Sequence, residues 1–64
     1  MIKKVKEMIK IIELDGWVLY AQKGSHKQYK HPTKKGRVTI PDHGKSEVLE
    51  HMIVKSILKQ AGLL

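Results

Sequence analysis

A histidine that directly follows a tight turn is the feature of this sequence best suited to chemistry. Gly24 and Ser25 are typical of a two-residue hairpin turn, His26 follows at once, and residues 27–29 continue a strand-like alternation. Imidazole titrates near neutral pH and is the side chain that most often transfers protons in enzymes. His26 is therefore the candidate catalytic residue. A solvated turn histidine is the alternative interpretation.

Cationic side chains near this histidine could bind phosphate groups. Strand alternation places His26, Gln28 and Lys30 on one face and Lys27 and Tyr29 on the other. Lys30 therefore ranks first among the cations as a partner of His26. The candidate residues for contact with phosphate groups are the turn and its neighbouring cations: Lys23, Gly24, Ser25, Lys27, Lys30 and Arg37.

The overall charge also favours a polyanionic partner. The 64 residues include 13 Lys and Arg against 6 Asp and Glu, which gives a net charge of +7. Such a chain favours nucleic acid or an acidic protein, although a merely lysine-rich solvated surface is the alternative. The length predicts a single domain over residues 1–64.

The remaining histidines do not predict a metal site. The chain has no cysteine, so thiolate ligands and disulfides are excluded. His31, His43 and His51 do not combine with His26 in any known ligand spacing, so we expect neither a metal nor another cofactor. We expect His31 to be partly buried, and Trp17 to belong to the core rather than to stack on a base.

No apolar run approaches the roughly 20 residues that span a bilayer. Lys6, Glu7, Lys10 and Glu13 interrupt what would be the apolar region of a signal peptide. We therefore expect a cytoplasmic protein without a membrane partner.

The elements that must hold His26 are visible in the periodicity. Ile2, Val5, Ile9 and Ile12 form one helical stripe, and Gly16 predicts that the helix ends near residues 14–15. Residues 17–23 and 26–31 predict two strands, with the Tyr29 face toward the core. A third short strand covers residues 38–40 and is closed by proline at position 41.

The last helix is predicted from about residue 50 to residue 61. Its expected buried stripe is Ile53, Val54, Ile57, Leu58 and Ala61. The start of this helix stays open between Ser46 and His51, because Ser46 is a plausible N-cap, whereas residues 45–49 could equally be extended.

This order predicts an α+β fold of the type α-β-β-β-α. The apolar residues suffice to cover only one face of a three-stranded antiparallel sheet, so both helices must lie on that face. The other face is then open to solvent, and His26 lies on it.

The chain also resembles a known family. The matching segments are Gly16-Trp17 after the first helix, Lys23-Gly24-Ser25-His26 with Tyr29, His31-Pro32, Val38-Thr39-Ile40-Pro41, and the closing Lys55-Ser56-Ile57-Leu58-Lys59-Gln60-Ala61-Gly62-Leu63. Together they resemble the HicA family of small toxins from toxin–antitoxin pairs. The resemblance covers essentially the whole chain.

The resemblance implies a fold similar to double-stranded-RNA-binding domains. It also implies a toxin of a type II toxin–antitoxin system that cleaves messenger RNA without metal, and an antitoxin of the HicB type that masks it. The catalytic histidine of the family corresponds to His26.

Metal-free RNA cleavage uses the 2′-hydroxyl as an internal nucleophile. A base must take its proton, an acid must help the 5′-oxygen to leave, and cations must stabilise the charge on the phosphate. His26 is the base candidate, and the second acid or base is left open. Two alternatives also stay open: a non-catalytic RNA-binding module, and a domain that docks an antitoxin or another acidic partner.

Overall fold

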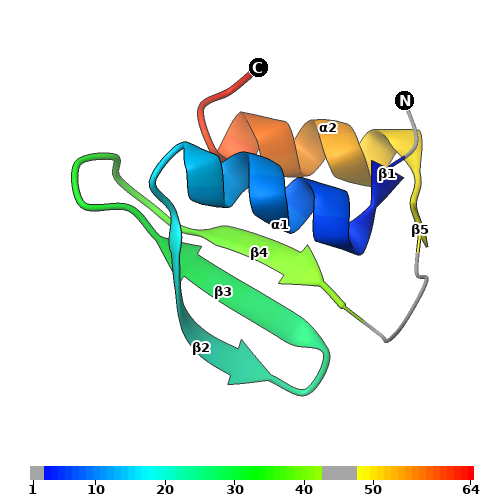
Figure 1. Cartoon of the computed structure of the whole chain (residues 1–64), viewed down its shortest axis with the longest axis horizontal. Helices are drawn as coiled ribbons and strands as arrows, with labels where there is room; N and C mark the ends of the chain where they lie inside the picture. Colours follow the sequence, from blue (N-terminus) through cyan, green and yellow to red (C-terminus); the bar gives the residue numbers. More distant parts are fainter. Residues whose placement is uncertain (1–2, 43–47) are drawn as a thin grey trace.

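The computed structural model describes residues 3–42 and 48–64, which form two helices and five strands (Figure 1). The elements follow the order β1 (Lys3–Lys4), α1 (Val5–Leu14), β2 (Val18–Lys23), β3 (His26–Lys30), β4 (Val38–Pro41), β5 (Val48–Leu49) and α2 (His51–Gln60). The predicted α+β class and the predicted α-β-β-β-α order are confirmed. The two-residue strands β1 and β5, which pair with each other, were not predicted.

Helix α1 forms because its apolar side chains recur at helical spacing. Val5, Met8 and Ile12 are buried, whereas Ile9 is only partly buried. The helix begins at Val5 because the preceding Lys3–Lys4 is extended, and the Glu7 carboxylate accepts a hydrogen bond of 2.9 Å from the Lys4 backbone N–H. The predicted contribution of Ile2 lies outside the described residues.

Both helices end in the same way, with a glycine in the left-handed region. After α1, Gly16 has φ +108°, and the backbone N–H of Trp17 donates to the Ile12 carbonyl at 3.1 Å. After α2, Gly62 has φ +73°, and Leu63 donates to Leu58 at 2.8 Å. This Schellman arrangement satisfies carbonyls that a helix end would otherwise leave without partners. The predicted end of α1 is confirmed.

Strands β2, β3 and β4 form one antiparallel sheet in that order. In β3, His26 is paired with Lys23 of β2 and with Pro41 of β4. The hairpin between β2 and β3 is therefore the predicted one, with Gly24 at φ +56°. Strand β3 ends at Lys30, one residue earlier than expected.

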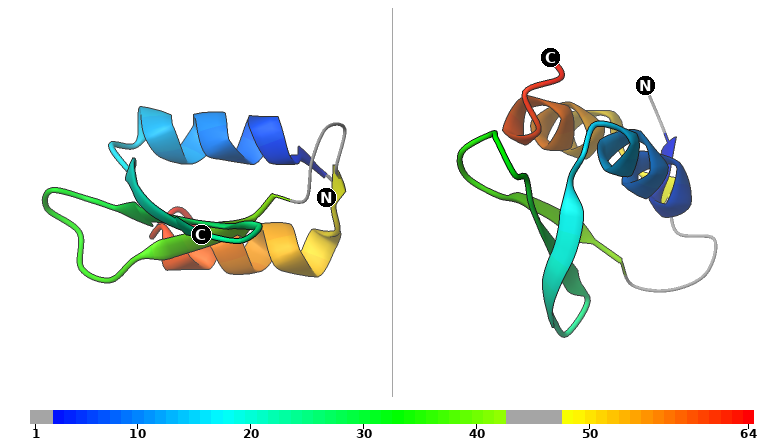
Figure 2. Two further views of the ribbon diagram at one scale, coloured as in Figure 1. Left: turned by 90° about the horizontal axis from the view of Figure 1, so that it is seen from below. Right: turned by 60° about the vertical axis from the view of Figure 1, so that its left-hand side comes forward.

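One face of the sheet carries the core. Tyr29, Val38 and Ile40 are buried on it, and they belong to a single apolar cluster with the buried residues of both helices. The buried side chains of both helices therefore pack against the core side of the sheet, and both helices lie beside β4 (Figure 1). The hairpin of β2 and β3 projects away from them (Figure 2). Strand β2 is consequently the least covered, since Leu19, which is paired with Tyr29 on the core face, is still 43% exposed.

The start of α2 differs from the longer of the two predicted alternatives. Helix α2 begins at His51 after the N-cap residue Glu50, and Val48–Leu49 is extended as strand β5. The proposed N-cap Ser46 lies outside the described residues. The extended alternative is therefore confirmed for residues 48–49.

The predicted buried stripe of α2 was wrong at one position. Val54, Ile57 and Ala61 are buried and Leu58 is partly buried, but Ile53 is 40% exposed. A helix that starts at His51 presents a face with three- and four-residue steps to the core, and Ile53 lies at the edge of that face.

A polar cluster ties the ends of both helices to the chain that follows β3. The Lys34 ammonium donates to Asp15 Oδ2 at 2.5 Å and to the Ala61 carbonyl at 3.0 Å. His31 Nε2 lies 2.7 Å from the Asp15 carbonyl oxygen, and Nδ1 accepts from the Lys34 backbone N–H at 3.1 Å. The His31 ring also packs edge-on against Trp17. His31 is thus partly buried and Trp17 is in the core, as predicted, and both have structural partners.

Candidate functional site

His26 is the first residue of β3, and it lies on the open side of the sheet. Its register partners are Lys23 on one side and Pro41 on the other, and its side chain is exposed. Because Tyr29 points into the core three residues later, strand alternation directs His26 away from it. The strand backbone restricts where this imidazole can move while leaving the ring accessible to a large ligand.

Hydrogen bonds to the backbone carbonyls of Gly24 and Ser25 hold the turn that precedes His26. The Gln22 side-chain amide donates to the Gly24 carbonyl at 3.0 Å. On the other side, the Asp42 N–H donates to the Ser25 carbonyl at 2.6 Å. A side chain at Gly24 would meet open space, so the glycine serves the positive φ of the turn and leaves its backbone approachable. Ser25 takes part in the contact with Asp42 through its backbone carbonyl.

A second group of side chains gathers further along the open face, and we call Tyr20, Gln28, Lys30 and Arg37 the Tyr20 cluster. Gln28 Oε1 accepts hydrogen bonds from the Tyr20 hydroxyl at 3.0 Å and from Arg37 Nη1 at 3.5 Å. The Lys30 ammonium lies 4.6 Å from the centroid of the Tyr20 ring. An exposed aromatic ring beside two cations suits a nucleotide, because its base can stack while its phosphates meet the charges.

Tyr20 was not among the site residues predicted from the sequence. A register shift between Leu19 and Ala21 makes Tyr20 an extra residue in β2. Both faces of β2 carry apolar groups, so periodicity could not assign the direction of this ring. The remaining signal was its aromatic type in a strand that pairs with the His26 strand.

The register changes the order of the predicted cations around His26. Lys23 is directly opposite His26, where paired side chains are about 5 Å apart at Cβ. Lys30 shares the face, but it is four residues along the strand, roughly 13 Å away. Lys23 rather than Lys30 is therefore the cation closest to His26, whereas Lys30 belongs to the Tyr20 cluster.

Lys27 is separated from the other predicted contacts. It points to the covered side of the sheet, and its ammonium forms an ion pair of 2.8 Å with Asp42. The hydrogen bond to Asp42 raises the pKa of Lys27 above its ordinary value of 10.5. This charge is already compensated, so Lys27 is the least suitable of the predicted residues for binding phosphate.

In the described parts of the chain, residues 3–42 and 48–64, no group of three His, Cys, Asp or Glu side chains could hold a metal ion. Neither helix in these segments has the length and apolar character required to cross a membrane.

The family model described as the HicA toxin of bacterial toxin–antitoxin systems matches residues 5–63. This range contains α1, α2, the three-stranded sheet and every predicted site residue. No curated protein matches the chain.

Proposed function

The chain belongs to the HicA toxin family of toxin–antitoxin systems, and on this basis we propose that it is an endoribonuclease that cleaves messenger RNA without a metal ion. It acts as one domain in the cytoplasm, and a HicB-like antitoxin neutralises it. The observation that carries the proposal is the placement of His26, an exposed imidazole on the open sheet face directly opposite a lysine.

In this proposal, neutral His26 takes the proton from a ribose 2′-hydroxyl, and the resulting oxyanion attacks the adjacent phosphorus. The bond to the 5′-oxygen breaks, and this oxygen takes a proton from a water molecule, which the His26 imidazolium then reprotonates. The products are a 2′,3′-cyclic phosphate and a 5′-hydroxyl. Lys23 stabilises the additional negative charge that develops on the phosphate oxygens. The rigid hairpin contributes by holding the two side chains in a fixed relation.

The Tyr20 cluster binds the nucleotide next to the scissile bond. The Tyr20 ring offers a stacking surface, and Lys30 and Arg37 meet the flanking phosphates. Gln28 holds the tyrosine hydroxyl and so restricts the orientation of the ring. This division of roles separates cleavage at the hairpin turn from binding further along the face.

The test compares the wild type with His26→Ala. We expect the wild type to cleave single-stranded RNA in the presence of EDTA and to leave 2′,3′-cyclic phosphate ends. His26→Ala should bind the same RNA with similar affinity and cleave it at least a hundredfold more slowly. If both proteins bind RNA and neither cleaves it, the chain is a non-catalytic RNA-binding module instead.

The antitoxin part of the proposal has its own test. A HicB-like protein encoded beside this chain should form a complex with it and stop cleavage at a one-to-one ratio of active sites. Binding without inhibition would contradict neutralisation by masking.

A further inference from the structure

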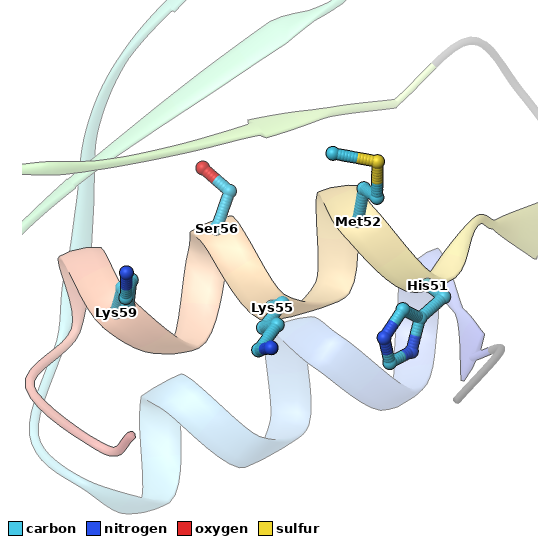
Figure 3. Close-up of a pocket in the computed structure, with 5 residues that line it drawn as sticks. All are labelled: His51, Met52, Lys55, Ser56 and Lys59. Carbon is cyan, nitrogen blue, oxygen red and sulfur yellow. The ribbon is translucent and has the colours of Figure 1, made fainter.

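The outer side of helix α2 carries positive charge that the proposed cleavage mechanism does not use. Lys55 and Lys59 are one helical turn apart and therefore share a face. Together with His51, Met52 and Ser56 they line an open hollow along the helix (Figure 3). Both lysines are exposed, and within residues 3–42 and 48–64 neither forms an ion pair.

This face differs from an ordinary solvated helix surface. Helix α1 also carries two lysines, Lys6 and Lys10, but it balances them with Glu7 and Glu13. Helix α2 has no acidic residue between its first and last positions. A solvated face gains a few tenths of a kcal/mol from each pair of opposite charges three or four residues apart, and α2 forgoes this gain. The uncompensated charge favours an anionic ligand.

The α2 face is continuous with the open face of the sheet. Thr39 of β4 is paired with Gln28 of the Tyr20 cluster. The Thr39 backbone N–H donates to Gln60 Oε1 at 3.0 Å, and Gln60 Nε2 donates to Ser56 Oγ at 3.3 Å. Ser56 projects from α2 toward β4 (Figure 3). Exposed polar groups therefore connect the two surfaces over the edge of β4.

We infer that Lys55 and Lys59 form a second RNA-binding surface, which holds the phosphates of the substrate strand several nucleotides away from the cleaved bond. This inference rests on the proposed function and adds a minimum substrate length to it. The helix lies roughly 15 Å from His26, one strand spacing plus one helix packing distance away. A dinucleotide at His26 does not reach α2, whereas a strand that crosses β4 does. The exposed Met52 thioether offers such a strand an apolar contact.

Binding is tested in the His26→Ala background, so that the RNA stays intact. The variants are Lys55→Gln with Lys59→Gln, and the matched control Lys6→Gln with Lys10→Gln, which removes the same charge from α1. The probe is a labelled single-stranded RNA of about 12 nucleotides, and the dissociation constant is measured from about 50 to 200 mM salt. For the α2 variant we expect affinity on the order of tenfold lower at low salt and a salt slope lower by about 1.4, since each phosphate contact to a single strand contributes about 0.7.

The control should keep nearly the wild-type slope. Equal loss in both double variants would show a general charge effect and overturn the inference, as would an unchanged slope in the α2 variant. An α2 variant that binds RNA normally but loses a protein partner would assign this face to protein docking, which also overturns it.

Cleavage separates this inference from the proposed function. With His26 present, the ratio of kcat/KM for the long RNA to that for a dinucleotide should fall about tenfold in the α2 variant. An unchanged ratio would contradict the inference while leaving the nuclease proposal intact. If the wild type cleaves neither RNA, the nuclease proposal fails, and the binding experiment still decides the role of Lys55 and Lys59.

Discussion

The chemistry proposed for this chain depends on which cation stands beside His26. Strand parity from the sequence places Lys30 on the correct face, and that placement holds in the structure. Register adds what parity cannot give, because the position of the turn pairs Lys23 with His26 and leaves Lys30 beside Tyr20. Parity depends on one strand alone, whereas register depends on two strands and a bulge.

This difference predicts unequal effects of removing the two lysines. Lys23→Gln should lower kcat for RNA cleavage about a hundredfold, as expected for the loss of one group that stabilises charge at the reacting centre. Lys30→Gln should mainly raise KM, because it removes a flanking phosphate contact and leaves the reacting phosphate untouched. Steady-state kinetics on one RNA substrate measures both. A larger loss of kcat for Lys30→Gln than for Lys23→Gln would contradict the assignment.

Asp15 links protonation to the stability of the fold. The hydrogen bond from Lys34 is the main cause that holds the pKa of Asp15 below its ordinary value of 3.8, and desolvation opposes it. Lys34, Trp17 and His31 all face this carboxylate. Since the folded state favours the ionised form, this contribution to the free energy of unfolding is fully present above about pH 3.8. It disappears as the pH falls through the lower pKa of the folded state.

Urea denaturation of the wild type and Asp15→Asn between about pH 2 and 7 tests this linkage. The wild type should be the more stable protein near neutral pH, and the difference should shrink steadily below pH 3.8. A difference that stays constant across this range would show that the ionised carboxylate contributes nothing specific.

At the scale of elements, periodicity predicts which segments are helices and strands. It does not predict which residues at the edge of an apolar helix face are buried. The apolar residues of α2 include Ile53, which fits a buried stripe in the sequence and yet is 40% exposed in the structure. The short pairing of Lys3–Lys4 with Val48–Leu49 sets the start of α2. Two-residue strands give too weak a periodic signal to be recognised in a sequence.

The two isoleucines of α2 should therefore respond differently to truncation. Ile57→Ala should lower the free energy of unfolding by about 2 to 5 kcal/mol, because it removes a fully buried side chain and leaves a cavity. Ile53→Ala should cost only about 1 kcal/mol, since its side chain is already 40% exposed and alanine favours the helix. Urea denaturation measures both losses. Equal losses would mean that Ile53 is buried like Ile57, as the sequence predicted.

At the scale of the whole molecule, positive charge has opposite effects on folding and on binding. The chain of 64 residues has a net charge of +7, and the fold confines this charge to a body with a radius of gyration of 10.8 Å. Their mutual repulsion opposes the folded state, while the same field attracts RNA. Salt screens both interactions over about 10 Å at 0.1 M. The free protein should therefore become more stable under the same conditions in which its complex with RNA becomes weaker.

Thermal denaturation at pH 7 with increasing sodium chloride tests this opposition. Raising the salt from about 20 to 300 mM should stabilise the free protein by about 1 kcal/mol, which for a domain of this size raises Tm by about 4 to 8 °C. Lys55→Gln with Lys59→Gln should start from a higher Tm and gain less from salt, because α2 has no acidic residue to offset the two charges. A Tm that does not change with salt would mean that the cations are too far apart to repel one another, and the positive surface would then cost the fold nothing.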